Sequence, residues 1–183
     1  GETCIVSNSD IIFDDTLSLL EDENLDNKFL CLTRWDINED GTVEFYSPRY
    51  GPEVSQDAWI FQSPLPINLD NTNIPLGHTG CDNKIARVAF DSGLQVCNPS
   101  RSIIIKHLHI TSYRTTAALN EKRILGNYLY VEPLENFESP DAYTTSKVWV
   151  DPTTKKHRFE NTKITNFVKG QRPVATSNKT AYQ

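Results

Sequence analysis

The chain opens on Thr3-Cys4-Ile5-Val6-Ser7-Asn8-Ser9-Asp10, an apolar run that ends in a polar cluster. The run over 3–7 contains β-branched residues and predicts a strand. Asp10 would then lie near the C-terminal edge of a sheet, where open α/β folds bind their ligands. A carboxylate there, with Asn8 on the same side of the strand, could hold a hard divalent cation through oxygen. The alternative is that Asp10 or Asp14 caps a following helix.

Apolar runs and helical spacing alternate along the chain after this strand. The runs that predict strands lie at 3–7, 29–33, 43–46, 58–61, 95–97 and 102–108, and helical spacing occurs at 13–20 and 83–90. This alternation favours an α/β fold, with some parallel strands in a mixed sheet and with flanking helices.

The character of the sequence changes after Gly126 to hairpin-like pieces. Strand-like runs at 146–150 and 157–159 flank the turn Asp151-Pro152-Thr153-Thr154. We therefore expect a main domain over 1–133 and a hairpin-containing extension over 134–183, packed on the same domain.

Length and composition restrict the class of protein. The 183 residues suffice for one domain with a real core, and the net charge of -6 argues against a nucleic-acid partner. No apolar run is long enough to cross a bilayer, so we predict a soluble, cytoplasmic protein with no transmembrane segment. The four cysteines have wide, irregular spacing, which favours reduced thiols over a disulfide framework.

Residues 36–41 resemble the first half of a calcium-binding EF-hand loop, with oxygen side chains at alternate positions before Gly41. The twelfth loop position, which requires a bidentate Glu, is Ser47, and no amphipathic helix precedes Asp36. We therefore interpret 36–41 as a turn between two strands.

Two further clusters contain side chains that could act as a general base or as metal ligands. Asp82 lies at the predicted start of a helix, where it is either the N-cap or a general base aimed into a cleft. His107 and His109 share one face of a predicted strand, a common metal-ligand geometry that a half-buried strand also shows by chance. A metal-dependent hydrolase using His78, Asp82, His107 and His109 is disfavoured, because no HExxH spacing occurs.

Taken together, the clusters form an ordered series of motifs. They read Asn8-Ser9-Asp10-Ile11-Ile12-Phe13-Asp14-Asp15-Thr16, Leu32-Thr33-Arg34-Trp35, Ser55-Gln56-Asp57-Ala58-Trp59-Ile60-Phe61, Leu76-Gly77-His78-Thr79-Gly80-Cys81-Asp82-Asn83-Lys84-Ile85-Ala86, Asn98-Pro99-Ser100 and His107-Leu108-His109. This series resembles nucleotide-sugar-dependent glycosyltransferases of the GT-A type, especially those of bacterial polysaccharide clusters and large algal viruses. The resemblance runs from Ser7 to about Pro133.

The resemblance implies transfer of a sugar from a nucleotide-diphosphate donor to a hydroxyl of a glycan acceptor. In that family an acidic DxD-like motif holds a divalent metal, usually manganese or magnesium, on the donor diphosphate. Asn8, Ser9 and Asp10 match this motif, with Asp10 as the metal ligand. His107 or His109 would complete the metal shell.

The resemblance also implies the remaining site residues. Asp82 matches the base that activates the acceptor, and Asp57 is the competing candidate. Trp35 and Trp59 could present flat faces to sugar rings, with core packing as the alternative for both. Asn83, next to Asp82, is expected to contact the substrate.

The sequence departs from the family pattern in two ways. Asn8 stands where many members have an acid. The nucleotide-binding half that precedes the DxD-like motif in that family has no counterpart before it here, so the chain corresponds to the C-terminal portion of the family fold. This leaves three alternatives: the chain is part of a longer one, it works with a separate segment, or it no longer binds donors. The last alternative corresponds to a non-catalytic carbohydrate-binding or interaction module.

Overall fold

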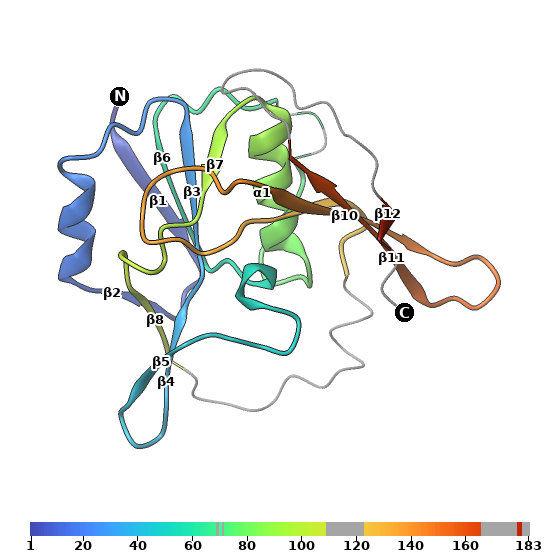
Figure 1. Ribbon diagram of the computed structural model, residues 1–183, viewed down its shortest axis with the longest axis horizontal. Helices are drawn as coiled ribbons and strands as arrows, with labels where there is room; N and C mark the ends of the chain where they lie inside the picture. Colours follow the sequence, from blue (N-terminus) through green and yellow to red (C-terminus); the bar gives the residue numbers. More distant parts are fainter. Residues whose placement is uncertain (69, 71, 109–122, 166–178, 181–183) are drawn as a thin grey trace.

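The computed structural model describes residues 1–68, 70, 72–108, 123–165 and 179–180, and its strands form three four-stranded sheets (Figure 1). The central sheet has the order β1-β6-β3-β7, the junction sheet β2-β8-β4-β5, and the C-terminal sheet β12-β11-β10-β9. The fold is therefore mixed α/β, as expected, but sheets dominate it. The expected flanking helices reduce to one α-helix and two short 3-10 helices among the described residues.

The elements have the following bounds. The central sheet contains β1 (Thr3–Ser7), β6 (Ala58–Gln62), β3 (Lys28–Leu32) and β7 (Gln95–Cys97). The junction sheet contains β2 (Ile11–Phe13), β8 (Ile105–Leu108), β4 (Trp35–Ile37) and β5 (Val43–Phe45). The C-terminal sheet contains β12 (Lys179–Thr180), β11 (His157–Ile164), β10 (Tyr143–Val150) and β9 (Gly126–Tyr130). The helices are α1 (Cys81–Asp91) and the 3-10 helices η1 (Asp15–Leu20) and η2 (Pro52–Val54).

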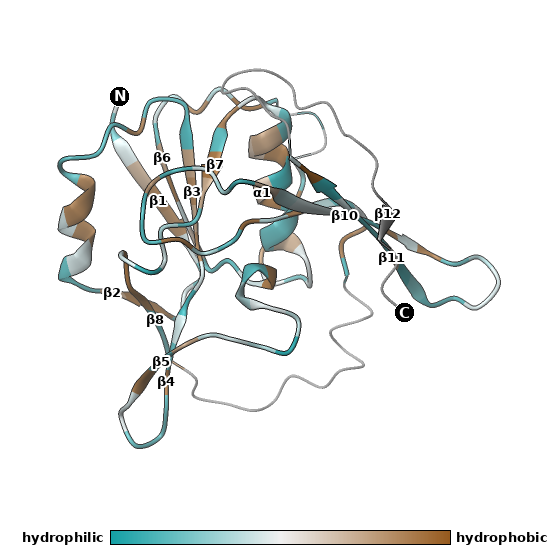
Figure 2. Ribbon diagram, viewed as in Figure 1, coloured by the Kyte–Doolittle hydropathy of each residue, from teal (hydrophilic) through white to brown (hydrophobic). Residues whose placement is uncertain are grey.

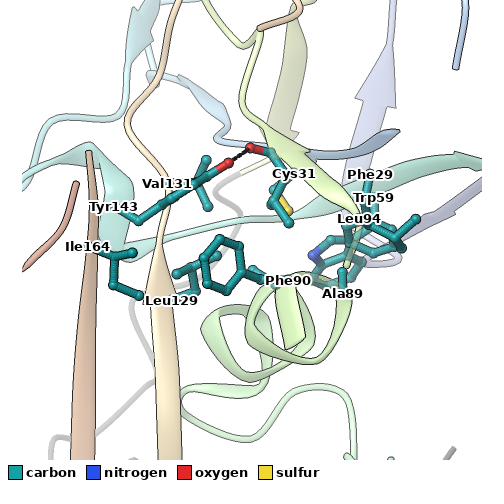
Figure 3. Close-up of a cluster of buried hydrophobic side chains, with 12 residues drawn as sticks. Phe29, Cys31, Trp59, Ala89, Phe90, Leu94, Leu129, Val131, Tyr143 and Ile164 are labelled. Carbon is teal, nitrogen blue, oxygen red and sulfur yellow. Dashed lines mark hydrogen bonds between the residues drawn. The ribbon is translucent and has the colours of Figure 1, made fainter. Parts of the chain in front are cut away.

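The inner strands of the central sheet, β3 and β6, are largely buried on both faces, which explains why they are continuous apolar runs rather than alternating ones. Figure 2 shows apolar residues along these strands. One face packs on α1 and the C-terminal sheet, as Figure 3 shows for Trp59, Phe90 and Leu129. The other face packs on η1, where Leu17 and Leu20 contact its core.

Helix α1 begins and ends where local signals place it. Gly80 precedes it with a left-handed φ of 85°, and Gly93 follows it with a φ of 89°. Glycine adopts this conformation without steric cost, so it commonly ends helices. The predicted end at 92–93 is confirmed. The start is two residues before the predicted one, which makes Asp82 the second helical residue rather than the N-cap.

The junction sheet continues strands of the central sheet. β1 leads into β2 through residues 8–10, β3 into β4 through 33–34, and β7 into β8 through 98–104. Three of the motifs singled out in the sequence, which contain residues 8–10, 33–34 and 98–100, lie at these crossings. The fold therefore brings residues that are far apart in the sequence to one place.

Residues 13–20 were expected to form a helix, and this expectation is partly wrong. Residues 11–13 pair with β8 as strand β2, and only the 3-10 helix η1 follows. Asp14 is its N-cap, because its Oδ1 accepts hydrogen bonds from the backbone N–H of Thr16 at 3.1 Å and from the Thr16 hydroxyl at 2.5 Å. The capping role considered for Asp10 or Asp14 therefore belongs to Asp14.

Several smaller predictions are confirmed. The turn expected at 36–41 is that of the β4–β5 hairpin, although Asp36 and Ile37 are strand residues and the turn spans 38–42. β10 and β11 form the C-terminal hairpin around 151–154. β9 pairs with β10, so the C-terminal sheet takes strands from both sides of the expected boundary at 133. All four cysteines are free thiols, and within the described part of the chain no helix is both long and apolar enough to span a membrane.

Candidate functional site

A closed chain of polar contacts joins six side chains at the crossings between the central and junction sheets. We call it the polar ring, and its members are Asn8, Asp10, Arg34, Asp36, Asp57 and His107. The ring closes through the backbone of residues 8–10, because Asn8 and Asp10 follow the same strand. It contains three carboxylates against one guanidinium and one imidazole.

His107 lies between two of these carboxylates. Its Nε2 is 3.1 Å from Asp10 Oδ2, and its Nδ1 is 3.1 Å from Asp36 Oδ1. β8 lies between β2 and β4, which brings the imidazole close to the carboxylates that precede β2 and lie within β4. The His107 side chain is 12% exposed, whereas that of Asp10 is 40% exposed. Asp10 is therefore the ring carboxylate that is most accessible to a ligand.

Hydrogen-bond donors surround the carboxylate of Asp57. Its Oδ1 accepts a hydrogen bond from Asn8 Nδ2 at 3.0 Å, and its Oδ2 accepts one from Ser55 Oγ at 2.9 Å. The guanidinium of Arg34 lies 3.4 Å from the same Oδ2. Asp57 is also buried. These contacts hold the carboxylate in one orientation.

Asp82 lies beside the ring, in the first turn of α1. Its Oδ2 accepts a hydrogen bond from the backbone N–H of Gln56 at 3.2 Å. Burial raises the pKa of Asp82 to about 7, and the charge of Asp57 adds to this rise, although backbone N–H groups of Asn83 and Gln56 oppose it. Such a carboxyl group exchanges protons near neutral pH, as a general base must.

A divalent metal is implied by the sequence resemblance, and the ring offers it a limited set of ligands. Among the residues that the structure describes, no group of three or more His, Cys, Asp or Glu side chains is arranged to hold a metal ion. Both nitrogens of His107 already face carboxylates. Asp10 alone fits a metal that takes its other ligands from water and phosphate, as Mg²⁺ commonly does.

The structure brings together most of the acids and the histidine predicted from the sequence. Asn8, Asp10, Asp57 and His107 belong to the ring, and Asp82 is close enough for the charge of Asp57 to affect its pKa. Ser9 is exposed in the turn between Asn8 and Asp10. His109 lies outside the described residues.

The structure buries two of the predicted substrate contacts, and for Trp59 it favours the alternative of core packing. Trp59 is only 1% exposed and packs in the core beside α1 (Figure 3), so its ring has no face for a sugar. Asn83 is 4% exposed, and its Nδ2 donates to the backbone carbonyls of Glu53 and Leu129, both at 3.4 Å. The Trp59 side chain is therefore occupied by core packing, and the Asn83 side chain by hydrogen bonds to the backbone.

Trp35 keeps part of its surface exposed. Its indole Nε1 donates to the carbonyl of Ser100 at 3.0 Å, and its ring meets Phe45 edge-on at 5.1 Å between centroids. These contacts fix the indole at the base of the β4–β5 hairpin. Trp35 remains the aromatic candidate for a sugar contact.

Sequence reasoning assigned no site role to Arg34, Asp36 or Ser55. Asp36 had been assigned to a turn, and Arg34 occurs in a quoted motif without a stated task. A signal was nevertheless present, because Arg34 and Asp36 alternate with an apolar Trp35 at the start of a strand. Period-two alternation places both polar side chains on one face.

Comparison of the chain with known protein families, with curated proteins and with solved structures finds no match in any of the three. The functional argument therefore depends on the residues themselves.

Proposed function

We propose that the chain carries the catalytic side of a GT-A-like, metal-assisted glycosyltransferase, which moves a sugar from a nucleotide-diphosphate donor to an acceptor hydroxyl. The observation that carries this proposal is the convergence of Asn8, Asp10, Asp57 and His107 in one ring, with Asp82 beside it. The sequence resemblance nominated these residues from four separate segments. A shared role in one site would explain why residues from separate segments lie in contact.

Asp82 is the better candidate for the base. A pKa of about 7 leaves a large fraction of its carboxyl groups ionised at neutral pH and able to take the proton of an acceptor hydroxyl. Asp57, the competing candidate, is occupied by Asn8, Ser55 and Arg34. We therefore assign Asp57 to shaping the site and to supplying the negative charge near Asp82.

Asp10 is the candidate residue for holding manganese or magnesium against the donor diphosphate. A bound divalent cation would offset the negative charge that develops on the leaving diphosphate. His107 fits a supporting role, because its Nε2 fixes one oxygen of Asp10 from the buried side. The half-exposed carboxylate is thereby held in place for a ligand from solvent.

The central sheet could pair with a further strand at its edge strand β1. β1 has one partner among the described residues, and its Ile5 and Val6 are 40% and 41% exposed. Their register partners in β6, Ile60 and Trp59, are buried. An edge that continues two buried apolar faces favours pairing with another strand. A nucleotide-binding half, as the resembled family has, would supply one.

The proposal is tested by thermal unfolding with Mn²⁺ alone and with Mn²⁺ plus UDP- or GDP-sugars. A ligand that binds the folded state raises the unfolding midpoint, so we expect a rise with metal and donor together. Asp10→Asn keeps the shape of the side chain and should abolish the rise. Asp22→Asn, which removes an exposed acid after η1, is the matched control and should keep it.

Two results would count against the transferase. Free glycans that raise the midpoint while no donor does would favour the carbohydrate-binding module. A donor-dependent rise that persists in Asp10→Asn would exclude Asp10 as the anchor of the metal. Release of nucleoside diphosphate from the donor, lost in Asp82→Asn, would then report the chemical step separately from binding.

A further inference from the structure

Arg34 is the cation at the centre of the polar ring. Its Nε donates to Asp36 Oδ1 at 2.8 Å, and its Nη1 donates to Ser55 Oγ at 3.0 Å and lies 3.4 Å from Asp57 Oδ2. The guanidinium carbon lies 4.0 Å from the centre of the Tyr46 ring. With 18% of its side chain exposed, Arg34 is held in one place by two carboxylates, a hydroxyl and an aromatic face.

The guanidinium stays charged in this setting. Burial lowers the pKa of Arg34, but the charges of Asp57 and Asp36 outweigh it and raise the pKa above its ordinary value. A permanent cation beside Asp57 partly cancels the field of that carboxylate at other groups. Asp82 is one such group, because the charge of Asp57 contributes to its raised pKa.

Arg34 also joins the two halves of the ring. On one side, Asp36 holds His107, and His107 contacts Asp10. On the other side, Asp57 holds Asn8, which precedes Asp10 by two residues. Asp36 and Asp57 come from different sheets, and the planar guanidinium reaches both through separate nitrogens.

We propose that Arg34 is a positioning residue that couples the Asp10 side of the site to Asp82 through Asp57. The coupling deepens the proposed function, because it assigns one residue to both the metal-holding acid and the base. Arg34 acts on Asp82 by holding Asp57 and opposing its charge rather than by touching the substrate. Because charges act additively, the charge of Asp57 should raise the pKa of Asp82 and that of Arg34 should lower it.

Four ionisable groups near Asp82 are neutral and do not compete with this coupling near neutral pH, whereas the charged Arg123 and Glu53 act on its neighbours Tyr128 and Tyr130. Burial raises the pKa of Tyr128 to about 12, and it also raises the pKa of Tyr130, both in β9. Burial likewise raises the pKa of Cys31 in β3 and of Cys81 in α1. These groups stay neutral at pH 7, so Asp57 is the charged group that acts on Asp82 in this set.

The test measures the ionisation of Asp82 by carboxyl ¹³C NMR in the free protein, without substrate. The wild-type midpoint is expected near pH 7. Arg34→Gln should raise it by about 0.5 to 1 unit, because Asp57 then acts uncompensated. Asp57→Asn should lower it, and the midpoint of the double variant should lie between those of the two single variants. Arg101→Gln removes an exposed arginine that stacks 3.8 Å over Phe45, and it should leave the midpoint unchanged.

Either of two results overturns the proposal: an Asp82 midpoint that Arg34→Gln does not raise, or one that Asp57→Asn does not lower. If Arg34→Gln fails to fold, Arg34→Lys replaces it. Lys keeps a charge but cannot bridge both carboxylates, so a smaller rise is expected. Because the titration needs no donor, it can succeed even if sugar transfer is disproved. Given an active enzyme, Arg34→Lys should reduce kcat by about tenfold, with little change in KM.

Discussion

Two polar clusters occupy the same crossing between sheets, and they differ in charge. The first is the polar ring. The second is a buried network of Thr33, Asn98 and Ser100, which adjoins the ring because Thr33 directly precedes Arg34 in the chain. All three side chains of the network are completely buried. The ring, in contrast, exposes 40% of the Asp10 side chain and 29% of the Asp36 side chain.

The buried network is neutral and well paired. Asn98 Nδ2 donates to Thr33 Oγ1 at 3.0 Å and to the carbonyl of Val131 at 2.9 Å, and its Oδ1 accepts from the Ser100 hydroxyl. The Thr33 hydroxyl donates in turn to the carbonyl of Ser55 at 2.9 Å. The network therefore ties β3, β7 and the end of β9 to the segment that carries Asp57.

This difference in charge and exposure distinguishes a cluster that stabilises the fold from a candidate functional site. Buried polar groups that satisfy one another rigidify a fold, and the neutral network fits this role. The ring gathers three carboxylates around Arg34 and His107 and leaves one of them half exposed. Such an arrangement costs stability unless a ligand is bound, which makes it the better candidate for function.

Breaking the buried network should have the largest effect on stability. Asn98→Ala removes two donated hydrogen bonds and leaves the carbonyl of Val131 buried without its donor. We expect the free energy of unfolding to fall by about 4 kcal/mol, as unsatisfied buried groups and a cavity add together. Chemical denaturation measures this change. Asn38→Ala, in the exposed β4–β5 turn, should cost about 0.5 kcal/mol, and an equal loss in both variants would contradict the scaffold role.

This division of roles could not be predicted from the sequence. Asn98-Pro99-Ser100 has the composition of an ordinary turn, and only tertiary packing shows that its polar atoms are buried. Trp59 shows the same limit. An aromatic residue suits a sugar platform and a core equally well, and its place in the middle of the central sheet selects the core.

Local patterns predicted those elements that local interactions stabilise. The bounds of β1 match the predicted 3–7, and the end of α1 matches its glycine signal. β2 and β4 were missed, because each has three residues and depends on pairing with β8, which is far away in the sequence. The division into three sheets was missed for the same reason, because it depends on where strands cross from one sheet to another.

The second test removes the charge of Asp82. A carboxyl whose folded pKa is raised to about 7 stabilises the protein fully below its unfolded pKa of 3.8 and loses this contribution as the pH rises through 7. The free energy of unfolding should therefore fall by roughly 3 kcal/mol between about pH 5 and about pH 8. Asp82→Asn should lack this part of the fall. Asp22→Asn should retain it, and an identical pH dependence in all three proteins would remove Asp82 as the titrating group.

The smallest effect is expected from the ring itself. His107→Gln replaces the group between Asp10 and Asp36, and both contacts are close enough to solvent for water to compensate in part. We expect a loss of about 1 kcal/mol. Where the imidazole is protonated, this loss should shrink as ionic strength rises from about 0.05 to about 0.5 M, because salt screens partly exposed ion pairs. The cost of Asn98→Ala should not depend on salt, since that network carries no charge. Equal salt dependence in the two variants would mean that charge does not distinguish the two clusters, and the assignment of the ring to function would then depend on ligand binding alone.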